Sequence, residues 1–159
     1  MKHYNFSKII LKITLTVIVT ATISCAPKFS FNRKGLEIPM ASVTDETVKD
    51  LTSIAVGILT EDNFIVEHAN ADVGLVTTEW GGIHLGFGVN ARIRFTINIL
   101  KDLKTIKIRP TVEYKSRFGT WINANGQPIS KAHQNKINDY LTSVGERLYK
   151  RFSARLGKR

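Results

Sequence analysis

The sequence predicts an α+β protein: a single two-layer domain in which an antiparallel sheet carries two helices on one face. Its 159 residues suit one domain and are too few for two comfortable ones. Two long segments, 89–100 and 105–115, alternate between apolar and polar residues, which is typical of half-buried strands. Two other segments place apolar residues at helical spacing. The predicted order of elements is β-α-β-β-β-β-α.

The strand predictions follow the alternation along the chain. Residues 89–100 and 105–115 are joined by a short turn, so they predict an antiparallel hairpin with one face in water. Shorter strands are expected at 36–40, 64–69 and 73–80. The first of these contains Pro39, which is tolerated at a sheet edge. The glycines that follow Trp80 are expected to form a mobile hairpin loop: Gly81, Gly82, Gly86 and Gly88.

The helix predictions rest on spacing and on capping residues. Residues 45–59 form the first amphipathic segment, and Thr44 precedes it as the expected N-cap. Residues 116–129 resemble a loop. Ser130 is expected to cap the final helix, which Gly157 ends. The apolar stripe of that helix consists of Ile137, Leu141, Val144, Leu148 and Phe152.

The first 25 residues predict a targeting segment. Lys2, Lys8 and Lys12 precede an uncharged apolar run over 13–23, which is the pattern of a secretory signal peptide. As a helix this run spans about 16 Å, roughly half of a bilayer core, so it does not predict a membrane span. It ends at Thr22-Ile23-Ser24-Cys25, which resembles the lipobox of bacterial lipoproteins, with Thr22 in the place of the usual Leu.

The lipobox resemblance implies a processed and lipidated protein. Residues 1–24 would be a signal peptide removed before Cys25, and Cys25 would carry a diacylglyceryl group and a further acyl chain such as palmitate. Residues 25–34 would be the lipidated Cys and its tether, and residues 35–159 the single domain. Ala26 stands where an acidic residue would favour the inner membrane, so we expect an anchor on the periplasmic side of the outer membrane. The alternative is that Cys25 is an ordinary buried thiol.

The motifs and residue spacings of the sequence predict no enzymatic activity, no cofactor and no metal site. The pattern G-x-G-x-x-A at 86–91 matches a bare dinucleotide fingerprint, but it runs into a predicted strand, whereas the fingerprint needs a following helix. The histidines His68, His84 and His133 are too scattered for a recognisable metal site. No nucleophile motif is present. A hydrolase whose site escapes these patterns stays a distant alternative.

The charge pattern raises the question of anionic ligands. The net charge is +10, and the whole excess lies in residues 101–159. The candidate binding residues are Arg92, Arg94, Lys107 and Arg109 on the hairpin, and Arg147, Lys150, Arg151, Arg155 and Lys158 in the final helix and tail. These cations form either a solvated face or a binding patch. In the envelope the ligands would be anionic lipids, lipopolysaccharide phosphates or acidic proteins, and no nucleic acid is expected.

One further family resemblance concerns function. The segment Gly74-Leu75-Val76-Thr77-Thr78-Glu79-Trp80, followed by Arg92-Ile93-Arg94 in the long strand, resembles BamC-like lipoproteins of the outer-membrane assembly machinery. The resemblance implies a helix-grip domain and a non-catalytic accessory, scaffold or binding role. The alternative expectation is a binder or carrier of an amphiphile or lipopolysaccharide, held between the helices and the sheet.

Overall fold

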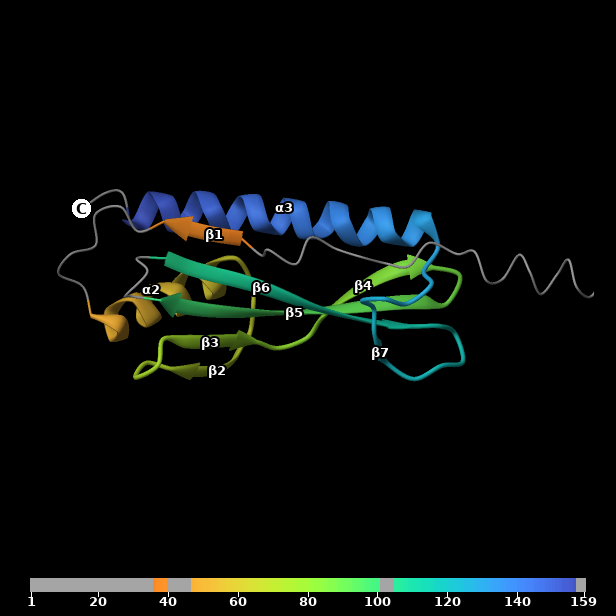
Figure 1. Cartoon of the computed structure of the whole chain (residues 1–159), viewed down its shortest axis with the longest axis horizontal. Helices are drawn as coiled ribbons and strands as arrows, with labels where there is room; N and C mark the ends of the chain where they lie inside the picture. The colour runs from red at the N-terminus through yellow and green to blue at the C-terminus, as the bar shows by residue number, and fades with distance from the viewer. Residues whose placement is uncertain (1–35, 40–46, 101–104, 157–159) are drawn as a thin grey trace, which may run out of the picture.

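The computed structural model describes residues 36–39, 47–100 and 105–156 (Figure 1). The expected signal peptide, Cys25 and the tether lie outside these residues. The described chain forms seven strands and two helices. The strands are β1 (Leu36–Pro39), β2 (Val66–Asn70), β3 (Leu75–Thr78), β4 (Gly81–Gly86), β5 (Val89–Leu100), β6 (Thr105–Lys115) and β7 (Ile122–Asn123). The helices are α2 (Val48–Glu61) and α3 (Lys131–Leu156).

The strands form one antiparallel sheet in the order β1-β6-β5-β3-β2. The predicted hairpin is its centre, because β5 pairs with β6 from Asn90↔Lys115 to Leu100↔Thr105. β5 is long enough that two strands share its other edge: β3 pairs with residues 96–98 and β4 with residues 89–93. β1 lies at one edge of the sheet, where Pro39 removes no central hydrogen bond. The predicted α+β class is confirmed.

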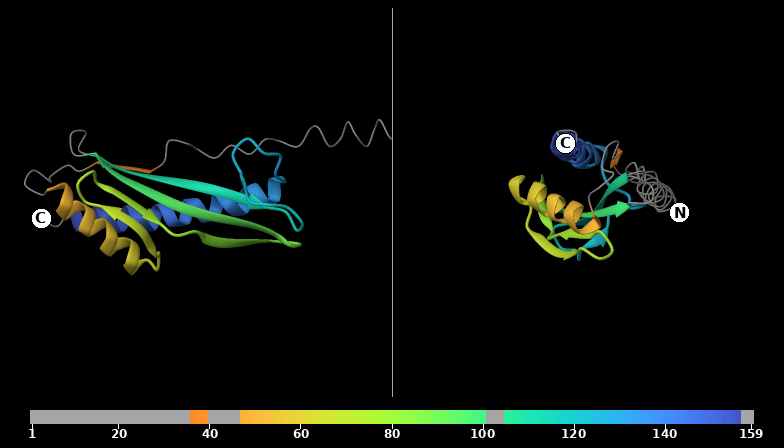
Figure 2. Two further views of the ribbon diagram at one scale, coloured as in Figure 1. Left: turned by 90° about the horizontal axis from the view of Figure 1, so that it is seen from below. Right: turned by 90° about the vertical axis from the view of Figure 1, so that its left-hand side faces the viewer.

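Both helices lie on the apolar face of the sheet. Figures 1 and 2 show α3 running along the sheet and α2 crossing one end of it. From Ala91 to Ile99, the alternate residues of β5 that point to the helices are all buried, whereas their neighbours are partly exposed. The resulting core is one cluster drawn from both layers, and its largest fully buried side chains are Phe152, Ile38, Leu51, Ile58, Leu59, Ile97, Ile106, Ile129, Ile137, Leu148 and Val76.

Helix α2 begins later in the chain than the spacing predicts. Its N-cap is Thr47, so the prediction of Thr44 is wrong; Thr44 lies outside the described residues. The hydroxyl of Thr47 accepts a hydrogen bond from the Asp50 backbone N–H at 3.2 Å, and the Asp50 carboxylate accepts one from the Thr47 N–H at 3.0 Å. This reciprocal capping box satisfies two N–H groups that the helix itself leaves unpaired, which locates the start of the helix.

Helix α3 begins as predicted after Ser130, whose hydroxyl accepts a hydrogen bond from the His133 backbone N–H at 3.3 Å. The helix continues to Leu156, and the predicted stop at Gly157 lies outside the described residues. Four of the five predicted stripe residues are buried, whereas Leu141 is only partly buried.

The glycine-rich segment after Trp80 is a strand as far as Gly86, so the prediction of a loop is wrong for Gly81, Gly82 and Gly86, whereas Gly88 does lie in the hairpin turn. β4 pairs with β5 from Gly81↔Ile93 to Gly86↔Val89. The hydrogen bonds between paired strands use backbone groups alone, so glycines can form them when a neighbouring strand offers a free edge. Leu85, which is 2% exposed, anchors this strand in the core. The expected loop at 116–129 likewise contains a short strand, β7, which pairs with β6.

Candidate binding surface

The outer face of the sheet, opposite the helices, carries a stack of alternating cations and indole rings. The Arg92 guanidinium carbon lies 4.5 Å from the centre of the Trp80 ring and 4.6 Å from that of Trp121. The Arg94 guanidinium lies 4.7 Å from the Trp80 ring, and the Lys115 ammonium 5.8 Å from the Trp121 ring. All four distances are within cation–π range. We call these five residues the Arg–Trp ladder.

Strand geometry brings the ladder together. The period of two along β5 places Arg92 and Arg94 on the same face, away from the buried Ile93. On β4, the residue paired with Arg92 is Gly82, which has no side chain to fill the space beside the guanidinium. The indole rings come from the residue that precedes β4 and the residue that precedes β7. The ladder therefore joins segments that are far apart in the sequence.

Two buried residues fix the path of the chain at the two ends of β3, the strand that leads to Trp80. Thr78, which is 1% exposed, accepts a hydrogen bond from the Phe95 backbone N–H at 3.0 Å and donates one to the Glu79 carbonyl at 3.0 Å. Gly74 has a φ of +65°, and a Cβ there would lie 2.9 Å from the Ile99 carbonyl oxygen. A side chain larger than hydrogen therefore does not fit at this turn. These residues are the Gly and Thr of the motif that resembles BamC-like proteins.

Acidic neighbours offset most of the positive charge on this face. Glu113 accepts a hydrogen bond from Arg92 Nε at 2.6 Å and lies 2.5 Å from its Nη2. Glu67 lies 3.4 Å from Arg94, and Glu37 lies 3.0 Å from Lys107. Arg109 is exposed, and no acidic partner is found for it among the described residues. The face is therefore less positive than its arginine and lysine content indicates.

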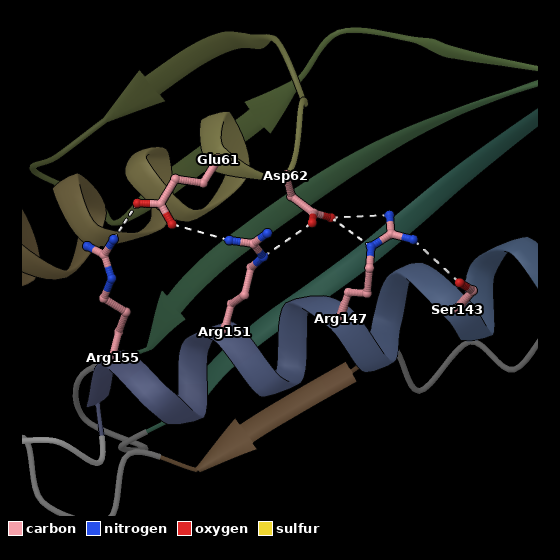
Figure 3. A network of polar contacts seen from close by, with 6 residues as sticks. All are labelled: Glu61, Asp62, Ser143, Arg147, Arg151 and Arg155. Carbon is pink, nitrogen blue, oxygen red and sulfur yellow. Dashed lines mark hydrogen bonds and ion pairs between the residues drawn. The ribbon is translucent and has the colours of Figure 1, made fainter.

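Three arginines of the final helix form a separate network with Glu61 and Asp62 at the end of α2 (Figure 3). Arg147 and Arg151 each lie 3.2 Å from Asp62, and Arg151 lies 3.3 Å from Glu61. Arg155 also pairs with Glu61. The three arginines are spaced by four residues, so they share one side of α3. We expected these side chains to form either a solvated face or a binding patch, whereas all three pair with acidic residues and join the two helices.

The network also explains the tolerance of two acids at the end of α2. Carboxylates are unfavourable at a helix C-terminus, where the dipole is negative, and the arginines of α3 offset that cost. The Asp62 side chain is 6% exposed, so its pairing matters more than that of the exposed Glu61. Nearby, burial raises the pKa of the Tyr140 phenol; the charge of Arg147 lowers that pKa and the charge of Asp62 raises it.

The remaining candidate residues are scattered. Lys150 is exposed on α3, and no ion pair is found for it within the described part of the chain. Lys158 lies outside the described residues. The structure thus separates the eight described candidate cations into the ladder face, the α2–α3 network and Lys150.

The other motifs are placed as follows. The G-x-G-x-x-A segment forms the turn between β4 and β5 and continues into β5, so the glycines face no helix N-terminus. Across the described ranges, no group of three His, Cys, Asp or Glu residues is close enough to hold a metal ion. The helices that the structure describes include none that is both long and apolar enough to cross a membrane.

The candidate binding residues predicted from the sequence leave out two residues that matter to this surface, Trp121 and Glu113. The signal for Trp121 was available, because the chain contains only two tryptophans and the other one belongs to the quoted motif. Its place opposite Arg92 depends on the path of the loop before β7. No protein-family model matches the chain, and comparison with curated proteins finds no match.

Proposed function

We propose that the protein is a lipid-anchored, non-catalytic binding or scaffold protein of the cell envelope, and that the Arg–Trp ladder is its contact surface for an envelope protein. The anchor is proposed from the signal-like run before Cys25, and outer-membrane attachment from the residue after it. The accessory role in outer-membrane assembly is proposed from the resemblance to BamC-like proteins.

The observation that carries the proposed surface is the position of Arg92 between two indole rings. Tryptophan and arginine are the residues most enriched among those that dominate binding energy at protein interfaces. The Arg92 side chain is held by Glu113 and by the two rings before any partner arrives, and it is still 30% exposed. Side chains that are already held lose less conformational entropy on binding.

The paired charges favour a protein partner over a purely anionic surface. Arg92, Arg94 and Lys107 already have carboxylate neighbours on the same face. A surface that binds lipid phosphates by charge alone would keep its cations unpaired. A mixed face of rings, cations and acids instead matches the composition of protein interfaces.

The alternative function is that of a carrier for an amphiphile or lipopolysaccharide, held between the helices and the sheet. The space between these layers is occupied by one continuous apolar cluster that includes Phe152, Leu148 and Ile97. Close packing of side chains leaves little volume for an acyl chain. The packing therefore supports binding at the surface.

Affinity isolation from detergent-solubilised envelopes tests the proposal. The bait is the full chain, compared with Trp80→Ala, Trp121→Ala and, as a matched aromatic control on α3, Tyr149→Ala. Tyr149 is 43% exposed and belongs to the other layer. We expect either tryptophan variant to bind the partner ~30-fold more weakly, which is a loss of about 2 kcal/mol of binding free energy, and so to fail to recover it. Tyr149→Ala should still recover the partner.

The circular dichroism melting curve of each variant shows whether the fold is retained. Equal recovery of the same proteins by all three variants would contradict the proposed surface. If lipid or lipopolysaccharide is recovered in place of protein, in an amount proportional to the amount of bait, the carrier function would be supported.

A further inference from the structure

Two fully exposed phenylalanines lie at the end of the sheet where Lys115, the last cation of the Arg–Trp ladder, pairs with Asn90. Phe87 occupies the turn between β4 and β5, and Phe118 occupies the loop that follows β6. Their side chains are 98% and 93% exposed. Single exposed apolar residues are common, but two neighbouring phenylalanines held in water indicate a surface that is covered in use.

The two loops that carry these rings are in contact. Asn90 pairs with Lys115 at the ends of β5 and β6, so both loops leave the sheet at the same end. A Cβ added to Gly88 would lie 3.0 Å from Arg117 Cγ, which places the Arg117 side chain against the β4–β5 turn. The Arg117 guanidinium lies 5.4 Å from the Phe118 ring. Figure 2 shows both loops at the same end of the sheet.

The backbone presents Phe87 at the tip of its turn. Its φ is +52°, between Gly86 at +109° and Gly88 at +75°. A bulky residue rarely adopts this left-handed conformation, in which Gly, Asn or Asp is usual. The packing of the core cannot explain a phenylalanine here, because its ring contributes nothing to the buried cluster.

The charge around the rings suits an anionic partner. Residues 84–90 and 115–121 include Lys115 and Arg117 and contain no Asp or Glu. Aromatic rings with cations beside them are the composition that places a protein segment at the boundary between lipid headgroups and acyl chains.

Leu36, the first residue of β1, lies at the end of that strand nearer to the two loops. Leu36 pairs with Ile108 and Pro39 with Thr105, so β1 runs away from the Lys115 end of β6. From Ile108 to Lys115 the strand spans about 23 Å. The chain from Cys25 to Leu36 extends to at most about 36–40 Å. A lipid on Cys25 and the two rings can therefore reach one membrane surface.

We propose that Phe87 and Phe118 form a second membrane contact, inserting into the interface of a bilayer that contains anionic lipid, with Arg117 and Lys115 at the lipid phosphates. We call these four residues the loop-tip contact. It does not require lipidation of Cys25. It shares Lys115 with the Arg–Trp ladder, whereas Phe87, Arg117 and Phe118 lie outside that proposed partner surface. The sheet would then stand with this end toward the bilayer.

Site-specific fluorescence on the full chain tests the proposal. Cys25→Ser removes the only cysteine. In that background Phe87→Cys, Phe118→Cys and Val73→Cys are each labelled with a polarity-sensitive dye and mixed with vesicles of equal parts phosphatidylethanolamine and phosphatidylglycerol. Val73 is the matched control, because it is apolar and 65% exposed in the turn between β2 and β3, beyond the opposite end of β5.

We expect the dye at 87 and at 118 to shift its emission to the blue and to be quenched by spin-labelled lipid, while the dye at 73 does not change. Vesicles of phosphatidylcholine alone should give smaller shifts, because they lack anionic headgroups. The proposal is overturned if the dyes at 87 and 118 keep the emission they have in water. This holds whether the protein binds the vesicles by another surface or stays in solution. Equal shifts at all three positions also overturn it. Each of these outcomes leaves the Cys25 and ladder proposals standing, since neither depends on this readout.

Discussion

Replacement of the Thr78 hydroxyl by a methyl group should destabilise the domain without changing its shape. Thr78→Val keeps the volume and the branching of the side chain and removes only its hydrogen bonds. The hydroxyl accepts from the Phe95 N–H and donates to the Glu79 carbonyl, each at 3.0 Å. The site lies where β5 passes from pairing with β3 to pairing with β4, so no strand partner replaces the lost acceptor.

The magnitude follows from the burial of the group that loses its partner. Thr78 is 1% exposed and Phe95 is 3% exposed, so water cannot reach the Phe95 N–H. A buried donor left unpaired costs about 1–3 kcal/mol. We therefore expect Thr78→Val to lower the free energy of unfolding by about 1–3 kcal/mol, whereas Thr78→Ser keeps the hydroxyl and loses about 1 kcal/mol through the missing methyl group.

Urea denaturation of a chain that starts at Ala26, followed by circular dichroism, measures both variants. Thr77→Val is the matched control, because Thr77 is the neighbouring residue of β3 and is only partly buried. We expect its effect to stay within about 0.5 kcal/mol. If Thr78→Val is as stable as the unmodified chain, the hydroxyl does not join these strands and the reasoning fails.

Four further predictions concern other parts of the molecule. Cys25→Ser should abolish incorporation of radiolabelled palmitate and leave unprocessed precursor, since the thiol is the atom to be acylated; unchanged labelling would refute the lipoprotein proposal. Phe95→Ala should cost about 3–5 kcal/mol in the same urea assay, because the ring is buried and meets the Phe64 ring edge-on at 5.3 Å between centres; a loss below about 1 kcal/mol would contradict that packing. Asp62→Ala should cost about 1.5–3 kcal/mol and Glu61→Ala less than about 1 kcal/mol, because only the first carboxylate is buried against two arginines; equal losses would count against this order. Burial raises the pKa of the Tyr140 phenol, so its contribution to stability is complete below pH ~10 and is lost as the pH rises through the raised pKa; Tyr140→Phe should remove this part of the alkaline loss, and identical pH profiles would refute it.

The central hairpin and the two helices were predictable from the sequence because their signals are local and repeated. Alternation over 89–100 and 105–115 defines which residues face the core, and a shift by one residue would turn every side chain over. The stripe of α3 is likewise set by helical spacing, with Ser130 as its cap. The first helix was found with its start misplaced, because Thr44 and Thr47 are both suitable caps and only the contact with Asp50 distinguishes them.

β4 was not predictable from its residues, because glycines carry no preference for a strand. It forms because β5 extends beyond β3 and offers backbone donors and acceptors to whatever segment passes beside it. The same holds for the short strand β7 beside β6. Such strands depend on a neighbour that is distant along the chain.

The sequence by itself determined the fold class, the polar and apolar faces of the hairpin and the residues that point outward from it. Only the tertiary structure decided what those outward residues meet. It places Arg92 between Trp80 and Trp121, and it pairs the cations of α3 with Glu61 and Asp62. The physical reason is that side-chain periodicity is a property of one element, whereas charge pairing and ring stacking depend on how separate elements are packed together.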